Sequence, residues 1–238
     1  MSPTADRKTP PSKSPILCYV TDRKSLPPTS DHDAAAILVN RIAAVAAAGA
    51  DWIQIREKDL SGKACASLVR GAVRGTLRTA AGGQAATRII VNDRLDVSLA
   101  EQAGGLHLGE TSVPVAHSRK FILQAQRDGR VPPDFTIGVS CHSLDAAQSA
   151  AADGADYLFF GPIFTTPSKM RYGAPQGLDR LAQVCAAVRI PVLAIGGITV
   201  ENAASCVACG AAGIAAIRLF QDARDPRALI SSLREPLR

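Results

Sequence analysis

One short segment of the chain carries charges whose spacing suits the binding of an anion. Residues 51–62 read DWIQIREKDLSG, an apolar strand pattern that ends in four charged residues. Gln54 and Arg56 are two residues apart, so their side chains point to the same side of a strand, and Lys58 follows in the loop. A guanidinium and an ammonium group together compensate the charge of a phosphate or pyrophosphate. A salt-bridge cluster at the edge of a sheet would use the same residues.

Polar residues or glycines follow most other short apolar segments in the same way. They are Thr21, Asp22, Asn92, Asp93, His107, Glu110, Ser140, His142, Gly196, Gly197 and Arg218. A single case is also explained as a helix cap, because Ser, Thr, Asn and Asp are common just before helices. Their recurrence at nearly every strand end predicts one site assembled from many loops.

A long loop after the sixth apolar segment is a candidate for pyrophosphate binding. It reads GPIFTTPSKMRYGAPQG over residues 161–177 and contains Thr166, Ser168, Lys169 and Arg171. Long loops in compact domains are often functional, and hydroxyls, backbone amides and a lysine bind pyrophosphate well. Pro and Gly in this loop are equally typical of a solvated turn.

The segment AIGGITVEN, residues 194–202, indicates a second anion site. Gly196 and Gly197 lie between a strand and a helix with Thr199 as the predicted N-cap, so backbone amides can approach a phosphate there. The next strand, GIAAIRLF, is predicted to end in Arg218. A simple turn would also explain two adjacent glycines.

An internal repeat predicts the elements that position these residues. Four times, a helical stretch ends in a corner of small residues that leads into a strand: GADWIQIR, AGGLHLG, GADYLFFG and GAAGIAAIR. Gly49, Gly104, Gly154 and Gly210 mark these corners at intervals of 55, 50 and 56 residues. The strands ILCYVTD, RIIVND, TIGVS and PVLAIGG fall between the corners, which gives eight βα units.

Eight βα units in about 220 residues predict a single (β/α)8 TIM barrel over residues 16–238, since that fold takes roughly 250 residues. Residues 1–15, rich in Pro, Ser, Thr and charge, are predicted to form a flexible N-terminal tail. A doubly wound open sheet is the alternative, but the Gly-rich phosphate turn expected after its first strand is missing. In a barrel, catalytic groups lie at the carboxyl ends of the strands, and phosphates often bind the loops after strands seven and eight.

The composition restricts the partners and the location of the protein. A net charge of +6 and a pI of about 9.2 favour small phosphorylated substrates, or simply a basic surface. Only 4% of residues are aromatic and no basic run is interleaved with stacking residues, so nucleic acid is not expected as a partner. The apolar runs are too short to span a membrane, and no signal-peptide core begins the chain, which predicts a cytoplasmic location.

The six cysteines are too sparse for a secreted disulfide framework and are expected to be reduced. Cys206 and Cys209 have the spacing of a redox or metal site, but no second Cys/His pair lies near them in the sequence. We interpret them as two small residues on the packed face of a helix.

Together these motifs resemble those of the thiamine-phosphate synthases and their relatives, the thiazole tautomerases, which are (β/α)8 barrels. The resemblance runs from about residue 18 to residue 229. Its most specific pieces are Gln54-x-Arg56-Glu57-Lys58, Asn92-Asp93-Arg94, His107-x-Gly109, Gly161-Pro162-Ile163-Phe164, Thr166-Pro167-Ser168-Lys169 and Ile195-Gly196-Gly197-Ile198. It implies a synthase that joins an aminopyrimidine methyl pyrophosphate to a thiazole phosphate in thiamine biosynthesis and releases pyrophosphate.

The resemblance also implies a role for each motif. Gln54 and Asn92 would hold the pyrimidine, Asp93 would bind Mg²⁺, and His142 is a further substrate-binding candidate. The residues implied to act on the pyrophosphate are Arg56, Lys58, Ser140, Thr166, Ser168 and Lys169, of which Arg56, Lys58, Ser140 and Lys169 are the expected catalytic residues. The thiazole phosphate is implied to bind near Gly197, Ile217 and Arg218.

The chain departs from the family pattern at two places. Where synthases commonly carry a second metal-binding Asp, this chain reads Gly109-Glu110-Thr111-Ser112. We expect Asp93 and Glu110 to share the Mg²⁺, directly or through water, with Ser112 as a hydrogen-bonding neighbour. A solvent-facing Glu110 is the alternative. Arg218 stands where a small Ser is usual, which adds a phosphate contact or crowds the site.

Two other functions stay open from the sequence. A thiazole tautomerase moves a proton on a thiazole carboxylate phosphate without a metal, and His142 matches its catalytic histidine, although related synthases carry a histidine there too. The second alternative is a barrel that binds phosphate ligands without catalysing a reaction. Gln54, Lys58, Asn92 and Asp93 favour the synthase, because tautomerase chemistry does not require them. The sequence leaves the oligomeric state open.

Overall fold

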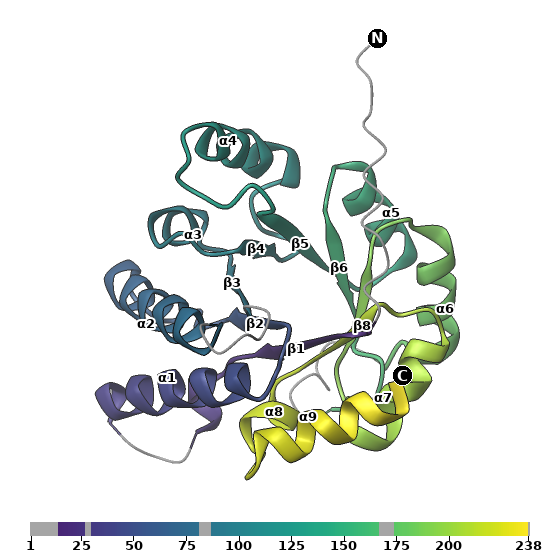
Figure 1. The fold of residues 1–238 in the computed structure, drawn as a ribbon. Helices are drawn as coiled ribbons and strands as arrows, with labels where there is room; N and C mark the ends of the chain where they lie inside the picture. Colours follow the sequence, from purple (N-terminus) through teal and green to yellow (C-terminus); the bar gives the residue numbers. More distant parts are fainter. Residues whose placement is uncertain (1–13, 27–29, 81–86, 167–173, 238) are drawn as a thin grey trace.

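Eight parallel strands form a closed barrel in the computed structural model, which describes residues 14–26, 30–80, 87–166 and 174–237. Each strand pairs with the next one along the chain, and the last pairs with the first to close the sheet (Figure 1). The strands are β1 (Ile16–Val20), β2 (Trp52–Ile55), β3 (Arg88–Asn92), β4 (Gly105–Leu108), β5 (Thr136–Cys141), β6 (Tyr157–Phe160), β7 (Val192–Ile195) and β8 (Gly213–Ala216). This closed order confirms the predicted (β/α)8 barrel and excludes the open sheet.

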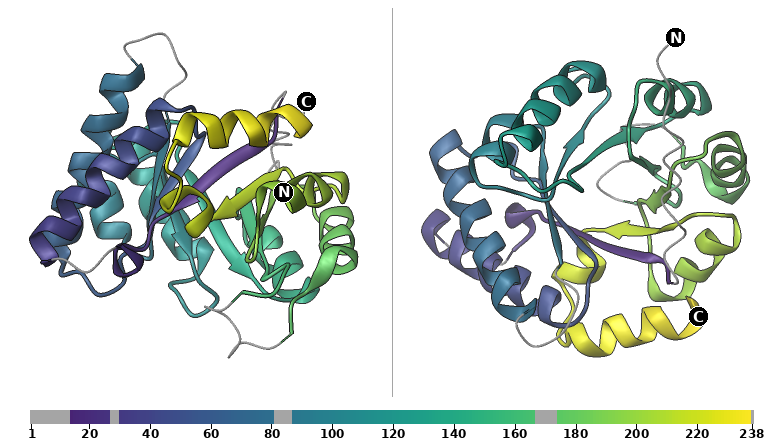
Figure 2. Two further views of the ribbon diagram at one scale, coloured as in Figure 1. Left: turned by 90° about the horizontal axis from the view of Figure 1, so that it is seen from below. Right: turned by 45° about the horizontal axis from the view of Figure 1, so that its top comes forward.

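Helices surround the barrel and cover its outer face (Figures 1 and 2). Those described are η1 (Arg23–Ser25), α1 (Asp31–Ala47), α2 (Gly62–Ala80), α3 (Leu95–Ala100), α4 (Val115–Arg127), α5 (Leu144–Ala152), α6 (Gly177–Ala187), α7 (Val200–Ala208), α8 (Arg218–Gln221), α9 (Pro226–Arg234) and η3 (Glu235–Leu237). Ser30, Ser143 and Asp225 start α1, α5 and α9 by accepting hydrogen bonds from backbone amides of the first turn. Thr199 and Asn202 form a capping box at α7, which confirms the predicted N-cap.

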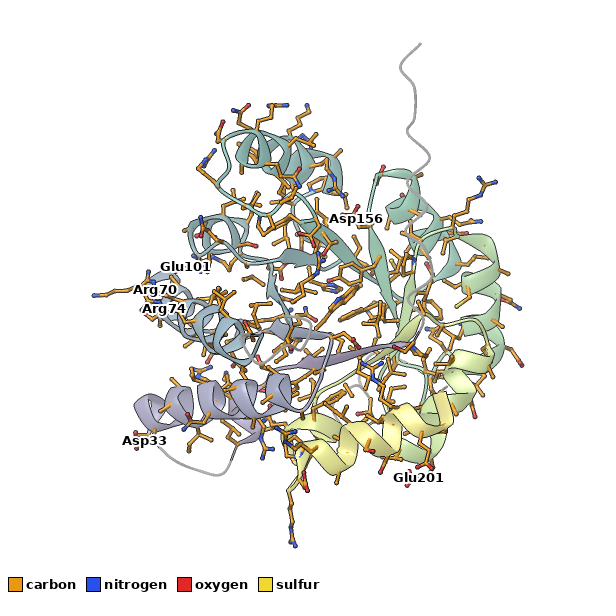
Figure 3. All side chains as sticks on the ribbon, viewed as in Figure 1. Asp33, Arg70, Arg74, Glu101, Asp156 and Glu201 are labelled. Carbon is orange, nitrogen blue, oxygen red and sulfur yellow. The ribbon has the colours of Figure 1, made fainter. Side chains whose placement is uncertain are left out.

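The strands bury both of their faces. Tyr157 and Phe159 of β6 belong to the layer inside the barrel, whereas Leu158 and Phe160 pack outward against the helices, and all four are buried. Side chains fill the space inside the ring of strands (Figure 3). The buried apolar residues of the inner layer include Cys18, Val20, Ile90, Tyr157, Phe159, Leu193 and Ala215. Burial on both faces explains why the strands read as continuous apolar runs.

The repeated corners share one backbone conformation at three of the four positions. Gly49, Gly154 and Gly210 have φ values of 104°, 92° and 94°, in the left-handed region that disfavours side chains. At the other corner the left-handed residue is Gln102, with φ of 52°, two positions before Gly104. Each corner leads from a helix into an even-numbered strand, so the repeat found in the sequence corresponds to a repeated structural turn.

The aspartate of two corners ties its own strand to the preceding one. Asp51 Oδ2 accepts a hydrogen bond from Leu17 N at 2.7 Å and pairs with Arg234 at 2.6 Å. Asp156 repeats the arrangement in the other half of the barrel: its Oδ2 accepts from Ile137 N at 2.7 Å and pairs with a guanidinium of α4 at 2.6 Å. The two Gly-Ala-Asp motifs therefore align the starts of β1 with β2 and of β5 with β6.

The eighth strand ends earlier than the sequence analysis predicted. β8 stops at Ala216, because Ile217 has helical backbone angles (φ −92°, ψ −77°) and Arg218 is the first residue of α8. The predicted strand end at Arg218 is therefore wrong. The first strand begins at Ile16. Residues 1–13 of the predicted tail lie outside the described residues, so the tail stays a prediction.

The described cysteines pack rather than form a site. All six are free; Cys206 is buried in α7, and Cys209 is half-buried at the C-terminal cap of that helix. In the described ranges no group of three His, Cys, Asp or Glu side chains is placed to hold a metal ion. Among the helices of the same ranges, none is long and apolar enough to cross a membrane.

We expect Gly213→Ala to destabilise the barrel, because a Cβ there would lie 2.1 Å from Ile16 O in the strand pair that closes the sheet. Overpacking of this kind costs roughly 3 kcal/mol. Gly75→Ala in α2 is the matched control: its Cβ would meet Ala43 Cβ at an ordinary 3.9 Å. Helix propensity should make that variant more stable by about 0.5–1 kcal/mol. Urea unfolding measures both changes, and equal stabilities would contradict the closure argument.

Candidate active site

Two amide side chains meet at the carboxyl ends of β2 and β3. Gln54 Nε2 donates a hydrogen bond to Asn92 Oδ1 at 2.9 Å, and Asn92 Nδ2 donates to Asp93 Oδ2 at 3.0 Å. Gln54 is only 2% exposed, so its amide is held in place. The structure therefore brings together the two residues that the sequence analysis assigned to the pyrimidine.

Arg56 and Lys58 follow β2 on a loop that a buried carboxylate supports. Arg56 N donates to Thr21 Oγ1 at 3.0 Å, and Thr21 Oγ1 donates to Glu57 Oε1 at 2.6 Å. Glu57 is 8% exposed and also accepts hydrogen bonds from Arg23 N at 3.1 and 3.2 Å. The sequence analysis did not select Glu57 as a site residue. The sequence did contain a hint of this role. Glu57 lies between Arg56 and Lys58, and side chains alternate along a strand, so Glu57 should point away from both basic residues.

The acidic groups near this loop are already paired with other cations. Arg23 binds Asp59 through two hydrogen bonds of 2.6 and 3.0 Å, and Lys24 Nζ lies 3.1 Å from the same carboxylate. The Arg23 guanidinium holds the pKa of Asp59 well below its usual range. Within the described part of the chain, the side chains of Arg56 and Lys58 make no ion pair. Both cations are therefore available to an anionic ligand.

His107 lies deeper in the barrel between two hydroxyl groups. Its Nε2 is 2.9 Å from Ser140 Oγ, and its Nδ1 is 3.0 Å from Tyr157 OH. Burial lowers the pKa of His107 to about 3; the charge of Asp93 opposes this shift and that of Arg56 adds to it. His107 is therefore a neutral imidazole at neutral pH. Tyr157 was missed in the sequence, where it reads as a core residue of the YLFF strand.

Ser112, rather than Glu110, is the residue that contacts Asp93. Ser112 Oγ donates a hydrogen bond to Asp93 Oδ1 and accepts one from Gly109 N at 2.8 Å. Glu110 Oε1 instead accepts a hydrogen bond from His142 N at 3.0 Å. Ser112 N donates to Gly109 O and closes a turn. This turn places Ser112 at the barrel mouth and Glu110 beside the neighbouring loop. The structure therefore brings Ser112, and not Glu110, into contact with Asp93.

His142 joins two loops at the rim of the barrel. Its Nδ1 lies 2.5 Å from Gly161 O, so this nitrogen carries the proton and donates to the carbonyl. Its backbone amide donates to Glu110. These two contacts connect the loop after β4 to the loop after β6 through the loop after β5.

The glycine pair after β7 is dictated by the loop that packs on it. Gly196 and Gly197 have φ values of 97° and 70°. A Cβ on Gly196 would lie 2.6 Å from Pro162 Cβ, and one on Gly197 would lie 2.7 Å from Phe164 Cβ. Phe164 N donates to Gly196 O at 3.0 Å, which fixes the contact. The sequence analysis explained these glycines by the approach of a phosphate; the structure adds a packing reason.

The residues expected around the thiazole phosphate share one edge of the barrel. Ile195 of β7 pairs with Ala215 of β8, and Gly197 and Ile217 each follow two residues later, at the carboxyl ends of these neighbouring strands. Arg218 is exposed and makes no ion pair within the described residues. Thr166 is half-buried in the loop after β6. The remaining expected residues of that loop, Ser168, Lys169 and Arg171, lie outside the described residues.

A cavity of about 430 Å³ lies beside the barrel mouth. It is lined by the loop after β4, including Glu110 and Ser112, and by one side of α5, including Ser149. Gln54, Arg56 and Asn92 do not line it. The cavity therefore lies on the outer side of the loop that carries Ser112, and Gln54, Arg56 and Asn92 form a separate site.

Comparisons with known proteins identify the family of the chain. The family model described as thiamine monophosphate synthase matches residues 19–220. The thiamine-phosphate synthase of Roseiflexus castenholzii is 40% identical over 223 residues, which cover 94% of this chain and 88% of that protein. The thiamine-phosphate synthase of Chlorobium luteolum is 37% identical over 220 residues, 92% of each chain.

The barrel also matches a solved structure of the same kind. Thiamine phosphate pyrophosphorylase from Pyrococcus furiosus superposes with a TM-score of 0.75 at 29% identity, covering 93% of this chain and 95% of that one. 3-Hexulose-6-phosphate synthase, with a TM-score of 0.57 at 13% identity, shares the fold alone. The extent of the family match and the identity of these relatives show that the chain belongs to the thiamine-phosphate synthase family.

Proposed function

We propose that this chain is a transferase that couples a hydroxymethylpyrimidine pyrophosphate to a thiazole phosphate, forming thiamine phosphate and releasing pyrophosphate. One observation carries the proposal: a hydrogen-bonded amide pair, Gln54 and Asn92, lies beside two cations, Arg56 and Lys58, that have no ion-pair partner among the described residues. An aminopyrimidine and a pyrophosphate need these two kinds of group next to each other. The family of the chain supports the same activity.

The amide pair suits the recognition of the pyrimidine. Gln54 Nε2 donates to Asn92, which leaves Gln54 Oε1 as an acceptor for an exocyclic amino group. The low exposure of Gln54 strengthens a hydrogen bond made there, because little water competes. Gln54 and Asn92 would thus orient the pyrimidine ring and place its methylene carbon next to Arg56 and Lys58.

The reaction then needs stabilisation of the leaving group more than a nucleophile from the protein. The bond between the methylene carbon and the pyrophosphate oxygen breaks with its electron pair on the oxygen, and the electron-rich ring supports the resulting cation. The lone pair of the thiazole nitrogen forms the new carbon–nitrogen bond. Arg56 and Lys58, with Lys169 and hydrogen bonds from Ser140, Thr166 and Ser168, would stabilise the departing charge.

The thiazole phosphate would bind on the opposite side of the mouth. Gly197 lies between β7 and the start of α7, Ile217 follows β8, and Arg218 adds an exposed guanidinium. This second anion site holds the acceptor so that its ring nitrogen faces the methylene carbon. The two anion sites together match the two phosphorylated substrates.

Mg²⁺ is the metal that we propose for this site. The donor set suits it, because Mg²⁺ is commonly held by one or two carboxylates together with substrate phosphate oxygens and waters. Asp93 would hold the ion, and Ser112 would orient the Asp93 carboxylate. When bound, Mg²⁺ would neutralise charge on the pyrophosphate. Glu110 is not proposed as a ligand, because its carboxylate accepts the His142 amide.

The tautomerase is not supported by a specific contact. His142 is the candidate base of a tautomerase. Its Nδ1–H donates to Gly161 O and its backbone amide donates to Glu110, so the residue connects two loops. In the synthase, we assign His142 only to the rim of the site, near the substrates.

We also propose a cytoplasmic location, supported by the small phosphorylated substrates and by the finding that no described helix could span a membrane.

Incubation of the purified protein with both phosphorylated substrates and Mg²⁺ should yield thiamine phosphate and pyrophosphate in equal amounts. Arg56→Ala should lower kcat/KM by about 100-fold or more, because the leaving group loses a cation. Arg70→Ala is the matched control: it removes an arginine that pairs with Glu101 at 2.6 Å and should leave the rate unchanged. Both residues lie on the outer side of the barrel (Figure 3).

A pyrophosphate-release assay measures these rates. No product from the parent protein would favour a barrel that binds phosphate ligands without catalysis. Equal rates for the parent and Arg56→Ala would reject this pyrophosphate pocket.

Glu57→Gln should weaken the support of the Arg56 loop. Replacing the carboxylate with a neutral amide weakens the hydrogen bonds from Thr21 and Arg23, which should cost about 2 kcal/mol of stability and lower kcat. Asp59→Asn is the control from the same cluster; its side chain is 40% exposed, so the expected loss is at most about 1 kcal/mol. Thermal unfolding and steady-state kinetics test this, and an unchanged kcat in Glu57→Gln would remove its positioning role.

Ser112→Asp should lower the Mg²⁺ concentration needed for half-maximal coupling, because it places a second carboxylate beside Asp93. Glu110→Gln keeps an acceptor for His142 N and should leave that concentration unchanged. Titration of Mg²⁺ in the coupling assay measures both. A greatly raised requirement in Glu110→Gln would instead support the ligand set that the sequence analysis expected.

A further inference from the structure

Three polar side chains form a hydrogen-bonded chain from the barrel interior towards the mouth. Tyr157 OH lies 3.0 Å from His107 Nδ1, and His107 Nε2 lies 2.9 Å from Ser140 Oγ. Tyr157 and His107 are each only 1% exposed, whereas Ser140 is half-buried at the carboxyl end of β5. The chain thus connects a buried phenol to a hydroxyl group that a ligand in the mouth can reach.

Packing fixes the phenol at the inner end of this chain. Gly138 of β5 pairs with Tyr157 of β6, and a Cβ on Gly138 would lie 2.0 Å from Tyr157 Cζ. The absence of a side chain at Gly138 therefore makes room for the ring. Trp52 packs edge-on against the ring at 4.7 Å between centroids, and Phe159 lies 5.6 Å away. These neighbours hold the hydroxyl of Tyr157 against His107.

The surroundings of Tyr157 decide the direction of its hydrogen bond. Burial raises the pKa of Tyr157 well above its usual value, so the phenol keeps its proton. Within the described residues, His107 Nδ1 is the one hydrogen-bond partner of the hydroxyl. If Tyr157 accepted a proton from Nδ1, its own O–H would be buried among aromatic rings without an acceptor, which is costly. Tyr157 therefore donates to His107.

The direction of the first hydrogen bond sets that of the second. A neutral imidazole carries one N–H group, so an Nδ1 that accepts leaves the proton on Nε2. His107 is 1% exposed and its two ring nitrogens face hydroxyl groups rather than carboxylates, so its surroundings favour the neutral imidazole. Nε2–H then donates to Ser140 Oγ. With a lone pair of Ser140 occupied in this way, its own proton is free to point to an acceptor in the mouth.

We propose that Tyr157 is a positioning residue that fixes the Nε2–H tautomer of His107 and thereby makes Ser140 a hydrogen-bond donor to a pyrophosphate oxygen. The identity of this acceptor rests on the proposed function. In the opposite tautomer Ser140 would donate to His107 and present only lone pairs to the anion, which repel it. Tyr157 thus controls, from inside the barrel, whether Ser140 attracts or repels the leaving group.

Nitrogen-15 NMR of the labelled protein tests the tautomer directly. The protonated and unprotonated nitrogens of His107 have distinct shifts, and variants of the other three histidines identify its signals. We expect Nε2 protonated in the parent and in Ser140→Ala, and a mixture of tautomers in Tyr157→Phe. Tyr19→Phe removes another buried hydroxyl, bound to Gln221 at 2.9 Å, and should leave the His107 signals unchanged. A parent protein with Nδ1 protonated would overturn the proposal.

Calorimetric binding of inorganic pyrophosphate with Mg²⁺ tests the consequence. Ser140→Ala should weaken binding about tenfold, because a hydrogen bond to a charged group is lost. Tyr157→Phe should weaken it several-fold, and the double variant should bind no worse than Ser140→Ala, since Tyr157 acts through Ser140. Additive losses in the double variant would overturn the proposal. Failure of the parent to couple its substrates, with tautomer and pyrophosphate binding as expected, would reject the proposed function alone.

Discussion

Closure of the parallel sheet is the constraint on which the site depends. β8 pairs with β1 where Gly213 leaves no room for a side chain beside Ile16, so the ring of strands has one register all the way round. In a closed parallel sheet every carboxyl end lies on one side, and groups from consecutive strands meet there. Gln54 therefore reaches Asn92 of the next strand, and His107 reaches Ser140 of the next. The Gly-Ala-Asp corners act at the other end, where Asp51 and its counterpart align the strand starts.

The distribution of charge follows from how the loops are supported. Two acidic residues lie next to Arg56 and Lys58 in the sequence, and either could have cancelled their charge. Glu57 instead turns inward to Thr21 and Arg23, and Asp59 pairs with Arg23. The acids thus brace the loop while the two basic side chains stay without ion pairs among the described residues. The four charged residues of this segment therefore have two roles in the structure: the acidic pair supports the loop, and the basic pair forms the binding surface.

The sequence allowed the prediction of features that depend on periodicity. Strands of period two place Gln54 and Arg56 on one side, and the repeated corners at Gly49 and Gly154 revealed the barrel. Features that depend on a turn or on a buried partner were not predictable in this way. The direction of Glu110 is set by the turn between Gly109 and Ser112, which the run of residue types does not encode. Tyr157 reads as core, because its polar contact is with a residue fifty positions away.

The centre of the site is neutral, and its charges lie at the rim. His107 is uncharged because it is buried above a layer of aromatic and aliphatic side chains, so it can offer a directed N–H but not a cation. Arg56 and Lys58 lie on the loop after β2 and Arg218 begins α8, so their charges remain solvated without a ligand. A cation buried in the barrel would carry a large desolvation cost in the free protein. A neutral, pre-oriented donor avoids that cost and still gains strength in a dry environment. The apolar interior and the polar chain through Tyr157 are therefore parts of one arrangement: the first excludes water, and the second supplies direction without charge.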